Sequence, residues 1–296
     1  MNIDNVFTVA FTDEPPLTTR VPRGEIWIDP QVLRSQWLPN SAEGVVRISS
    51  QIGSDLCFFS CTGFQPIPLK NKLLKEAVSL GKLSGLTCGA VIDGPWQRLT
   101  GTEDTLRMLL WLKKEPDLLE EKLNLTLLNI YKEMEAWKEA GIDLLLIADD
   151  IAHSSGPYFS PEHFNQILLP LYDRFLSLNA TNSPVYVGFH SDGDLSLLLP
   201  SLIKIGFTFF SLEPEAMDLL NVWQTYGRQV LIMSGIRASW LTIQTFDYTD
   251  KNNFKRVIPI LIGRGKLILS STCGLFHPPS IEKIKEIYSY VSSLQS

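Results

Sequence analysis

The stretch that decides the fold is PDLLEEKLNLTLLNIYKEMEAWKEAGIDLLLIADD, residues 116–150. Its first part places apolar side chains at close to helical spacing and predicts a helix over Pro116–Ala140, which Gly141 ends. Asp143–Ala148 follows as a short, almost wholly apolar run, typical of a strand buried on both faces. Two acidic residues, Asp149 and Asp150, come directly after it. The stretch therefore predicts a helix, a buried strand and a polar strand end, in that order.

The same unit recurs along the chain. Further strands are predicted at Asp55–Ser60, Leu86–Ile92, Val185–Phe189, Phe207–Ser211, Gln229–Met233 and Lys266–Ser270, with an eighth at Glu25–Ile28. Further helical patterns cover Pro161–Leu178, Leu195–Ile205, Pro214–Tyr226 and Pro279–Leu294. Strands that alternate with helices, without hairpin signals, indicate a parallel sheet, and a count near eight favours a closed barrel. We therefore predict an α/β fold, a single (β/α)8 TIM barrel over residues 23–296, after a short N-terminal arm at residues 1–22.

Composition narrows the function classes. The 296 residues are 45% hydrophobic and 20% charged, and the formal net charge is −6 with scattered basic residues, which does not support a nucleic-acid surface. The N-terminus lacks the pattern of a secretion signal, and no apolar run approaches the length of a membrane span. Four cysteines in a chain of this length do not indicate a disulfide framework. We expect a cytoplasmic protein that does not bind membranes.

In a TIM barrel the chemistry lies at the carboxyl ends of the strands. The polar residues that follow the predicted strands are therefore the candidates. They are Asp93, Asp149, Asp150, His190, Asp192, Glu213 and Cys273.

Each candidate also has a purely structural interpretation. Asp93 could cap a turn before Gly94. Asp149 and Asp150 point to opposite sides if the strand persists, so one could face the barrel mouth while the other caps a helix. Glu213 could be an acid at a helix start. His190 has no capping role, which favours a functional one.

The cysteines are read in the same way. Cys273 alone could be a small buried side chain. Cys57 and Cys61 fall on the same face of a strand, where core packing is the better interpretation of the pair.

Many short motifs carry a resemblance to a known family. In chain order they are Gly94-Pro95, Gly101, Pro116, Ala140-Gly141-Ile142-Asp143, Ala148-Asp149-Asp150, Gly156, Ser160-Pro161-Glu162, Leu169-Pro170, His190-Ser191-Asp192-Gly193, Gly206, Glu213-Pro214, Met217-Asp218, Tyr226-Gly227 and Ser234-Gly235-Ile236. Their order, from about residue 20 to the end, resembles the uroporphyrinogen decarboxylase superfamily. The resemblance implies a TIM barrel and an enzyme of one of two branches.

The first branch contains the true decarboxylases, which remove acetate carboxyls from a tetrapyrrole without a cofactor. The chain departs from their pattern at two places. Their arginine-rich N-terminal signature has only Arg20 and Arg23 as counterparts, and their late His-Gly motif is represented by Cys273-Gly274. A substrate with many carboxylates needs several arginines, and only Arg98 and Arg237 are obvious additions.

The second branch contains corrinoid-dependent methyltransferases, methylcobamide:coenzyme M enzymes among them, and the chain is nearer to it. Their zinc is held by His-x-Cys and a distant Cys; His190 and Cys273 match the outer ligands, and Asp192 replaces the middle one. Zinc accepts all three donor types, and positions two apart on a strand end share a side. His190, Asp192 and Cys273 are therefore the predicted metal ligands. The alternative is that the metal is lost and His190 and Asp192 form an acid–base pair.

The resemblance thus implies a methyltransferase that moves a methyl group between a small substrate and a corrinoid (cobalamin) held by a separate protein. Zinc at the barrel mouth would act as a Lewis acid. Asp93, Asp149, Asp150 and Glu213 are the candidates for substrate orientation or proton transfer. The alternatives are a uroporphyrinogen decarboxylase-like carboxy-lyase in tetrapyrrole metabolism, and a non-catalytic barrel that binds a corrinoid or tetrapyrrole.

Overall fold

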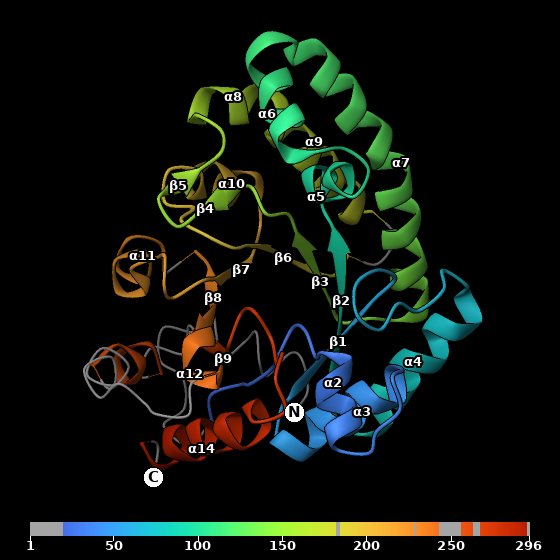
Figure 1. Ribbon diagram of the computed structural model, residues 1–296, viewed down its shortest axis with the longest axis vertical. Helices are drawn as coiled ribbons and strands as arrows, with labels where there is room; N and C mark the ends of the chain where they lie inside the picture. Colours follow the sequence, from blue (N-terminus) through green and yellow to red (C-terminus); the bar gives the residue numbers. More distant parts are fainter. Residues whose placement is uncertain (1–19, 182–183, 228, 243–255, 263–266, 295–296) are drawn as a thin grey trace.

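The computed structural model describes residues 20–181, 184–227, 229–242, 256–262 and 267–294. Its main feature is one parallel sheet of seven strands in the order β1-β2-β3-β6-β7-β8-β9, surrounded by helices (Figure 1). The strands are β1 (Leu56–Ser60), β2 (Thr87–Asp93), β3 (Leu144–Ala148), β6 (Tyr186–Ser191), β7 (Phe209–Leu212), β8 (Leu231–Gly235) and β9 (Leu267–Ser270). β4 (Ala152–His153) and β5 (Gly156–Pro157) form a separate antiparallel pair after β3. The parallel α/β architecture and its seven main strands confirm the prediction, although Lys266, the first residue of the last predicted strand, lies outside the described residues.

The predicted eighth strand, Glu25–Ile28, is not a regular strand. Only Arg23 and Ile28 form isolated bridges, to Leu269 and Leu275. The segment nevertheless lies between the two edges of the sheet, because Gly24 N donates to Leu269 O while Arg23 O accepts from the N–H groups at the start of β1. An irregular segment thus links β9 to β1 where an eighth strand would stand. Most of the predicted N-terminal arm, residues 1–19, lies outside the described residues.

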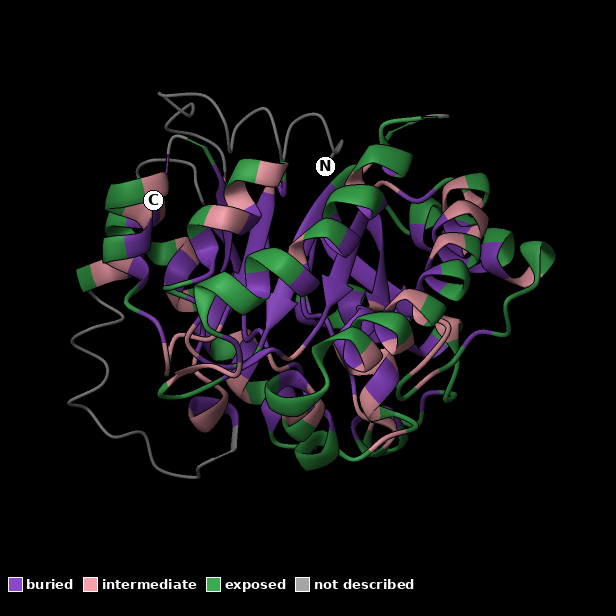
Figure 2. Cartoon of the chain, turned by 90° about the horizontal axis from the view of Figure 1, so that it is seen from above, coloured by how far each residue is buried: buried purple, intermediate pink, exposed green. Residues whose placement is uncertain are grey.

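The helices cover the outside of the sheet and turn their exposed faces outward (Figure 2). They are α2 (Pro30–Ser35), α3 (Ala42–Ile52), α4 (Asn71–Leu83), α5 (Pro95–Thr100), α6 (Thr105–Lys114), α7 (Pro116–Ala140), α8 (Pro161–Ile167), α9 (Leu169–Asn179), α10 (Leu199–Ile205), α11 (Leu219–Tyr226), α12 (Ala238–Thr242) and α14 (Ser280–Ser293), with a further helix at 256–262. None of the described helices is long and apolar enough to cross a membrane.

Three of the predicted helices differ in their bounds by more than one residue, whereas α14 is one residue shorter at each end than predicted. The pattern at 161–178 is divided into α8 and α9, because Pro170 has no N–H to continue the hydrogen-bond ladder. α10 and α11 begin four and five residues later than predicted, since turns at residues 196–198 and 214–216 precede them. α7 has the predicted bounds, and Gly141 ends it at a φ of 85°.

Two glycines let phenylalanine rings fill the barrel interior. Phe209 of β7 lies over Gly188 of β6, and Phe58 of β1 lies over Gly89 of β2. Both rings belong to an inner cluster of buried apolar side chains, which is distinct from the larger core between sheet and helices. Because alternate residues of a strand share a face, His190 points to the same interior as Gly188.

Glu25 ties the linking segment to the end of β9 and to α14. Its Oε2 accepts hydrogen bonds from the backbone N–H of Ser271 at 3.1 Å and from the Ser271 hydroxyl, and its Oε1 accepts from the Tyr288 hydroxyl at 2.8 Å. Burial raises the pKa of Glu25 to about 7, although these hydrogen bonds lower it. In the folded protein this carboxyl group therefore keeps its proton to a higher pH than an ordinary glutamate.

We expect Glu25→Gln to reduce the pH dependence of stability between pH 4.5 and about 7. In the wild type the unfolded chain releases the Glu25 proton near pH 4.5, whereas the folded chain retains it up to about pH 7. The stabilisation is thus complete below the unfolded pKa and is lost as the pH rises through the folded one, a decline on the order of 3 kcal/mol. Urea denaturation across this range measures the slope. Glu286→Gln, on the exposed face of α14, is the control; an unchanged slope in Glu25→Gln would contradict the assignment.

Candidate functional site at the barrel mouth

The candidate site begins with His190, the second-last residue of β6. In the register of the sheet it lies between Ala148 of β3 and Ser211 of β7, at the carboxyl end of all three strands. The His190 side chain is buried, with a 5% exposed fraction, and its Nδ1 lies 2.9 Å from the Ser211 hydroxyl oxygen. This contact orients the ring, so that Nε2 faces the opening of the barrel.

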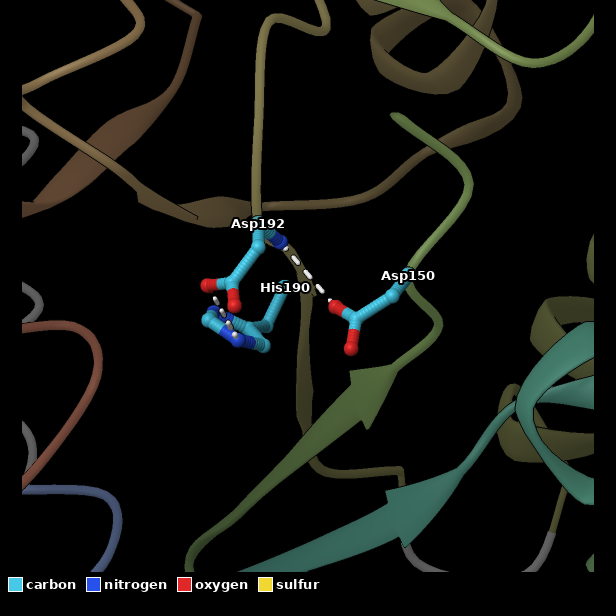
Figure 3. Close-up of side chains that lie close together, drawn as sticks. All are labelled: Asp150, His190 and Asp192. Carbon is cyan, nitrogen blue, oxygen red and sulfur yellow. Dashed lines mark hydrogen bonds and ion pairs between the residues drawn. The ribbon is translucent and has the colours of Figure 1, made fainter. Parts of the chain in front are cut away.

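Two carboxylates complete a compact cluster with His190 (Figure 3). The His190 Nε2 lies 3.7 Å from Oδ1 of Asp192, and the Asp192 backbone N–H donates to Oδ1 of Asp150 at 3.0 Å. One potential ligand atom from each of Asp150, His190 and Asp192 lies within 4.8 Å of the other two. We refer to these three residues as the rim cluster. Asp150 follows β3 and Asp192 follows β6, so neighbouring strand ends bring them together.

Cys273 lies beside the rim cluster. Its Sγ is 3.9 Å from Oδ1 of Asp192. Burial, and then the charge of Asp192, raise the pKa of the Cys273 thiol to about 12. The preceding residue, Thr272, is fully buried at a φ of 58°, a conformation that costs a β-branched residue about 1–3 kcal/mol. The turn that carries Cys273 is therefore held in place by its surroundings.

Asp149 points away from the opening. Its fully buried carboxylate accepts hydrogen bonds from the backbone N–H groups of Trp96 and Gln97, at the start of α5, and from the Tyr172 hydroxyl at 2.6 Å. Burial raises the pKa of Asp149 to about 7. The two adjacent acids thus have different roles, as one of the alternatives predicted. Asp149 accepts hydrogen bonds from N–H groups in the first turn of α5, and Asp150 joins the rim cluster.

The other two predicted acids lie around the cluster. Oε2 of Glu213 accepts the backbone N–H of Gly193 at 2.7 Å, which links the end of β7 to the residue after Asp192. α11 begins at Leu219 with Asp218 as its N-cap, so Glu213 is not a helix-start acid. Burial raises the pKa of Asp93, whereas a hydrogen bond from Thr62 and the charge of Arg98 lower it. The charge of Asp150 raises the same pKa, so Asp93 and Asp150 are electrostatic neighbours.

The remaining polar candidates do not join the rim cluster. Cys57 is buried against Cys88, with 3.9 Å between the sulfur atoms, which agrees with core packing. Cys61 lies beyond the end of β1 and does not share that contact. Arg20 pairs with Asp55 before β1, and Arg98 pairs with the buried Glu133 of α7. Arg23 donates to Ser292 and lies over the Tyr288 ring.

Sequence reasoning missed two residues that support the site, Ser211 and Tyr172. Ser211 is an inward residue within a strand, and Tyr172 lies inside α9, so neither follows the pattern of a polar residue at a strand end. A signal for Ser211 exists in the alternation of β7, where it is the polar member of an otherwise apolar run. No comparable signal marks Tyr172.

The donor set of the rim cluster fits a divalent metal ion. Zinc in proteins accepts imidazole nitrogens at about 2.0–2.1 Å and carboxylate oxygens at about 2.0–2.2 Å, and catalytic sites use three protein ligands. Burial raises the pKa of Asp192, the positive charge of His190 lowers it, and the charges of Asp150 and Glu213 raise it again. A cation in the cluster would relieve this crowding of like charge.

TIM-barrel enzymes carry their active sites at the carboxyl ends of the strands, and the histidine and acids of this chain lie at that end of its parallel sheet. Residues 72–294 match the family described as Uroporphyrinogen decarboxylase (URO-D), which is more than half of the chain. The chain belongs to this family.

Curated relatives and solved structures add two kinds of comparison. The methylcobamide:CoM methyltransferase MtaA of Methanosarcina barkeri is 24% identical over 196 residues, which are 66% of this chain and 55% of that protein. The chain thus spans about half the length of the curated relatives it matches.

Solved structures show the fold. A methyltransferase from Methanosarcina mazei has a TM-score of 0.74 at 15% identity, with 98% of each chain covered. A B12-independent methionine synthase from a Shewanella species has a TM-score of 0.60 at 12% identity, with 92% of this chain and 98% of that chain covered.

Proposed function

We propose that this protein transfers a methyl group between a small substrate and a corrinoid, with zinc bound by the rim cluster. The observation that carries the proposal is the meeting of Asp150, His190 and Asp192 at the mouth of a URO-D family barrel. The similarity to methylcobamide:CoM methyltransferases supports the choice of reaction.

In this proposal His190, Asp192 and Asp150 hold the ion and Cys273 flanks it. Asp150 takes the place that the sequence assigned to Cys273, because its carboxylate is the third donor within 4.8 Å of the other two. Bound zinc would act as a Lewis acid that favours the deprotonated form of a thiol, or polarises the heteroatom that carries a methyl group. The Ser211 hydroxyl holds the His190 ring in orientation, as the outer partners of metal-binding histidines do.

The surrounding acids position the substrate. Asp93 and Glu213 lie on either side of the rim cluster, and each presents a carboxylate that can accept a proton or hydrogen bond from a substrate heteroatom. Asp149 contributes indirectly, because its hydrogen bonds fix the start of α5 next to the turn that carries Asp150. We therefore assign Asp149 to positioning, Asp150 to the metal site, and Asp93 and Glu213 to direct contact with the substrate.

We infer that the corrinoid is supplied by a separate protein that docks over the barrel mouth. The similarity to a methylcobamide-dependent protein supports this partner.

The decarboxylase alternative has less support from the described residues. It needs arginines at the mouth to bind several carboxylates. Of the four that the sequence offered, three are already paired: Arg20 with Asp55, Arg23 with Ser292, and Arg98 with Glu133. Arg237 lines a cavity at the rim, and one arginine is too few for a substrate with many carboxylates.

A corrinoid assay tests the proposed reaction. The zinc-loaded protein is mixed with methylcob(III)alamin and a panel of small thiols, or with cob(I)alamin and O- and N-methylated donors. In the thiol direction the carbon–cobalt bond breaks, a carbon–sulfur bond forms, the thiol proton is released, and Co(III) becomes Co(I). We expect turnover in one direction, visible in the corrinoid absorbance and matched by the methylated or demethylated product. No corrinoid reaction in either direction, together with coproporphyrinogen made from uroporphyrinogen, would establish the decarboxylase instead.

A further inference from the structure

A cavity of about 320 Å³ lies at the barrel rim, beside the rim cluster but separate from it. Its walls come from the turn after β7, from the end of β8 with the start of α12, and from the helix at 256–262. β8, α11 and α12 lie along one side of the molecule (Figure 1). The lining residues used below are Met217, Gly235, Arg237, Trp240, Arg256 and Ile258. We call this space the β7–β8 cavity.

The cavity is built by close packing at β8. A Cβ atom at Gly235, which has a φ of 109°, would lie 2.7 Å from Cδ1 of Ile258. An L residue is strained at this φ, and its Cβ would also displace the Ile258 side chain, so glycine favours this close approach of the helix at 256–262 to the strand end. The side chains of Ile258 and Trp240 are buried, so the wall that carries Arg256 is anchored to the barrel.

The charged groups in the walls are not equivalent. Asp218 already accepts from two backbone N–H groups as the N-cap of α11, and Oε1 of Glu215 accepts from the Ser239 hydroxyl at 3.4 Å. The charge of Arg237 lowers the pKa of Glu215, although burial, the larger effect, raises it. Arg256 forms no hydrogen bond or ion pair with another described residue. Among the described residues both acids thus have donors, whereas the guanidinium group of Arg256 has no such partner.

Size and position then define the ligand. A volume of 320 Å³ is at the lower end of the range for small-molecule sites, and is too small for a corrinoid ring. The cavity also lies near the rim cluster. Glu213 directly precedes the wall residue Pro214, and its carboxylate accepts a hydrogen bond from the backbone N–H of Gly193, the residue after Asp192. A short molecule held in the cavity by one end can therefore direct its other end toward the cluster.

We propose that the β7–β8 cavity binds the anionic end of a short organic acid, with Arg237 and Arg256 as its charged contacts and Met217 and Trp240 against its carbon chain. The inference rests on the proposed function, because it identifies this acid as the small substrate of methyl transfer. Charge-assisted hydrogen bonds from guanidinium groups to a carboxylate are among the strong polar contacts of proteins.

Binding can be tested without metal or corrinoid. Metal-free protein is titrated calorimetrically with butanoate, butan-1-ol and butylammonium, which share a four-carbon chain and differ in charge. We expect butanoate to bind, and the alcohol and the cation to bind at least about tenfold more weakly. Arg256→Ala and Arg237→Lys should each weaken butanoate binding by about tenfold or more, while Arg47→Ala, an exposed arginine of α3, should leave it unchanged.

Equal binding of the three probes, no binding of butanoate, or binding unaffected by either arginine substitution would each overturn the proposal. These outcomes are separate from failure of the proposed function, because neither zinc nor a corrinoid takes part in the titration. Methyl transfer to substrates without an acidic group, with no preference for acids, would retain the reaction and reject the cavity as the substrate site.

Discussion

His190→Ala is expected to remove zinc from the protein and, with it, methyl transfer. His190 supplies the one nitrogen donor of the rim cluster, and its Nε2 lies 3.7 Å from Asp192. Removing it leaves two carboxylates, Asp150 and Asp192, with no neutral donor between them. Substitutions in the outer shell of a metal site already cost about 10–100-fold in affinity, so loss of a direct ligand should exceed about 100-fold. Metal analysis after gel filtration, and competition with a chromophoric chelator, measure the loss.

The matched control is His277→Ala, an exposed histidine after β9, which should retain one zinc per chain. Circular dichroism shows whether each variant is folded. Full zinc content in His190→Ala, or none in the wild type after zinc is added back, would reject the rim cluster as a metal site. The second outcome would favour His190 and Asp192 as an acid–base pair.

Cobalt substitution separates the two possible third ligands. Cobalt(II) bound by a thiolate shows a strong near-ultraviolet charge-transfer band, which oxygen and nitrogen ligands do not give. With Asp150 as the third ligand, the wild type and Cys273→Ser should have the same spectrum. A band that disappears in Cys273→Ser would restore the set His190, Asp192 and Cys273.

The strands could be predicted from the sequence because burial on both faces leaves a clear pattern of short apolar runs. The apolar run at Asp143–Ala148 has one structural interpretation, and β3 confirms it. The prediction of a regular eighth strand was wrong. The segment around Glu25–Ile28 is joined to both edges of the sheet by a few separate hydrogen bonds rather than by a continuous ladder. Short apolar runs do not reveal this difference.

The location of the candidate site could be predicted from the sequence, but the set of residues that come together there could not. Strand ends placed Asp150, His190 and Asp192 at one rim. Which member of the Asp149–Asp150 pair faces the mouth depends on the fit of α5, because the N–H groups at its start donate to Asp149 and not to Asp150. Such a choice between adjacent residues is made by tertiary contacts that the local sequence does not contain.

The second prediction with a large effect concerns stability, and it follows from the inner cluster of buried apolar side chains. Gly188→Val is expected to destabilise the protein by about 3 kcal/mol, at the upper end of what overpacking a core costs. A Cβ atom at Gly188 would lie 2.3–2.5 Å from three atoms of the Phe209 ring, where real Cβ contacts essentially never fall below 3.0 Å. The ring cannot move aside at low cost, because Phe209 is fully buried.

A double substitution tests this mechanism. Phe209→Leu removes ring atoms that a Cβ at Gly188 would meet, so it should recover part of the stability lost in Gly188→Ala, although Phe209→Leu alone is destabilising through the cavity it leaves. The control is Gly101→Ala, where the new Cβ meets its nearest atom at 3.4 Å and φ is −66°, so that little change is expected. Urea denaturation of Gly188→Ala, Phe209→Leu, the double variant and the wild type gives the coupling free energy, and the same measurement on Gly101→Ala gives the control. Additive effects of Gly188→Ala and Phe209→Leu would show that the glycine is not there to admit the ring.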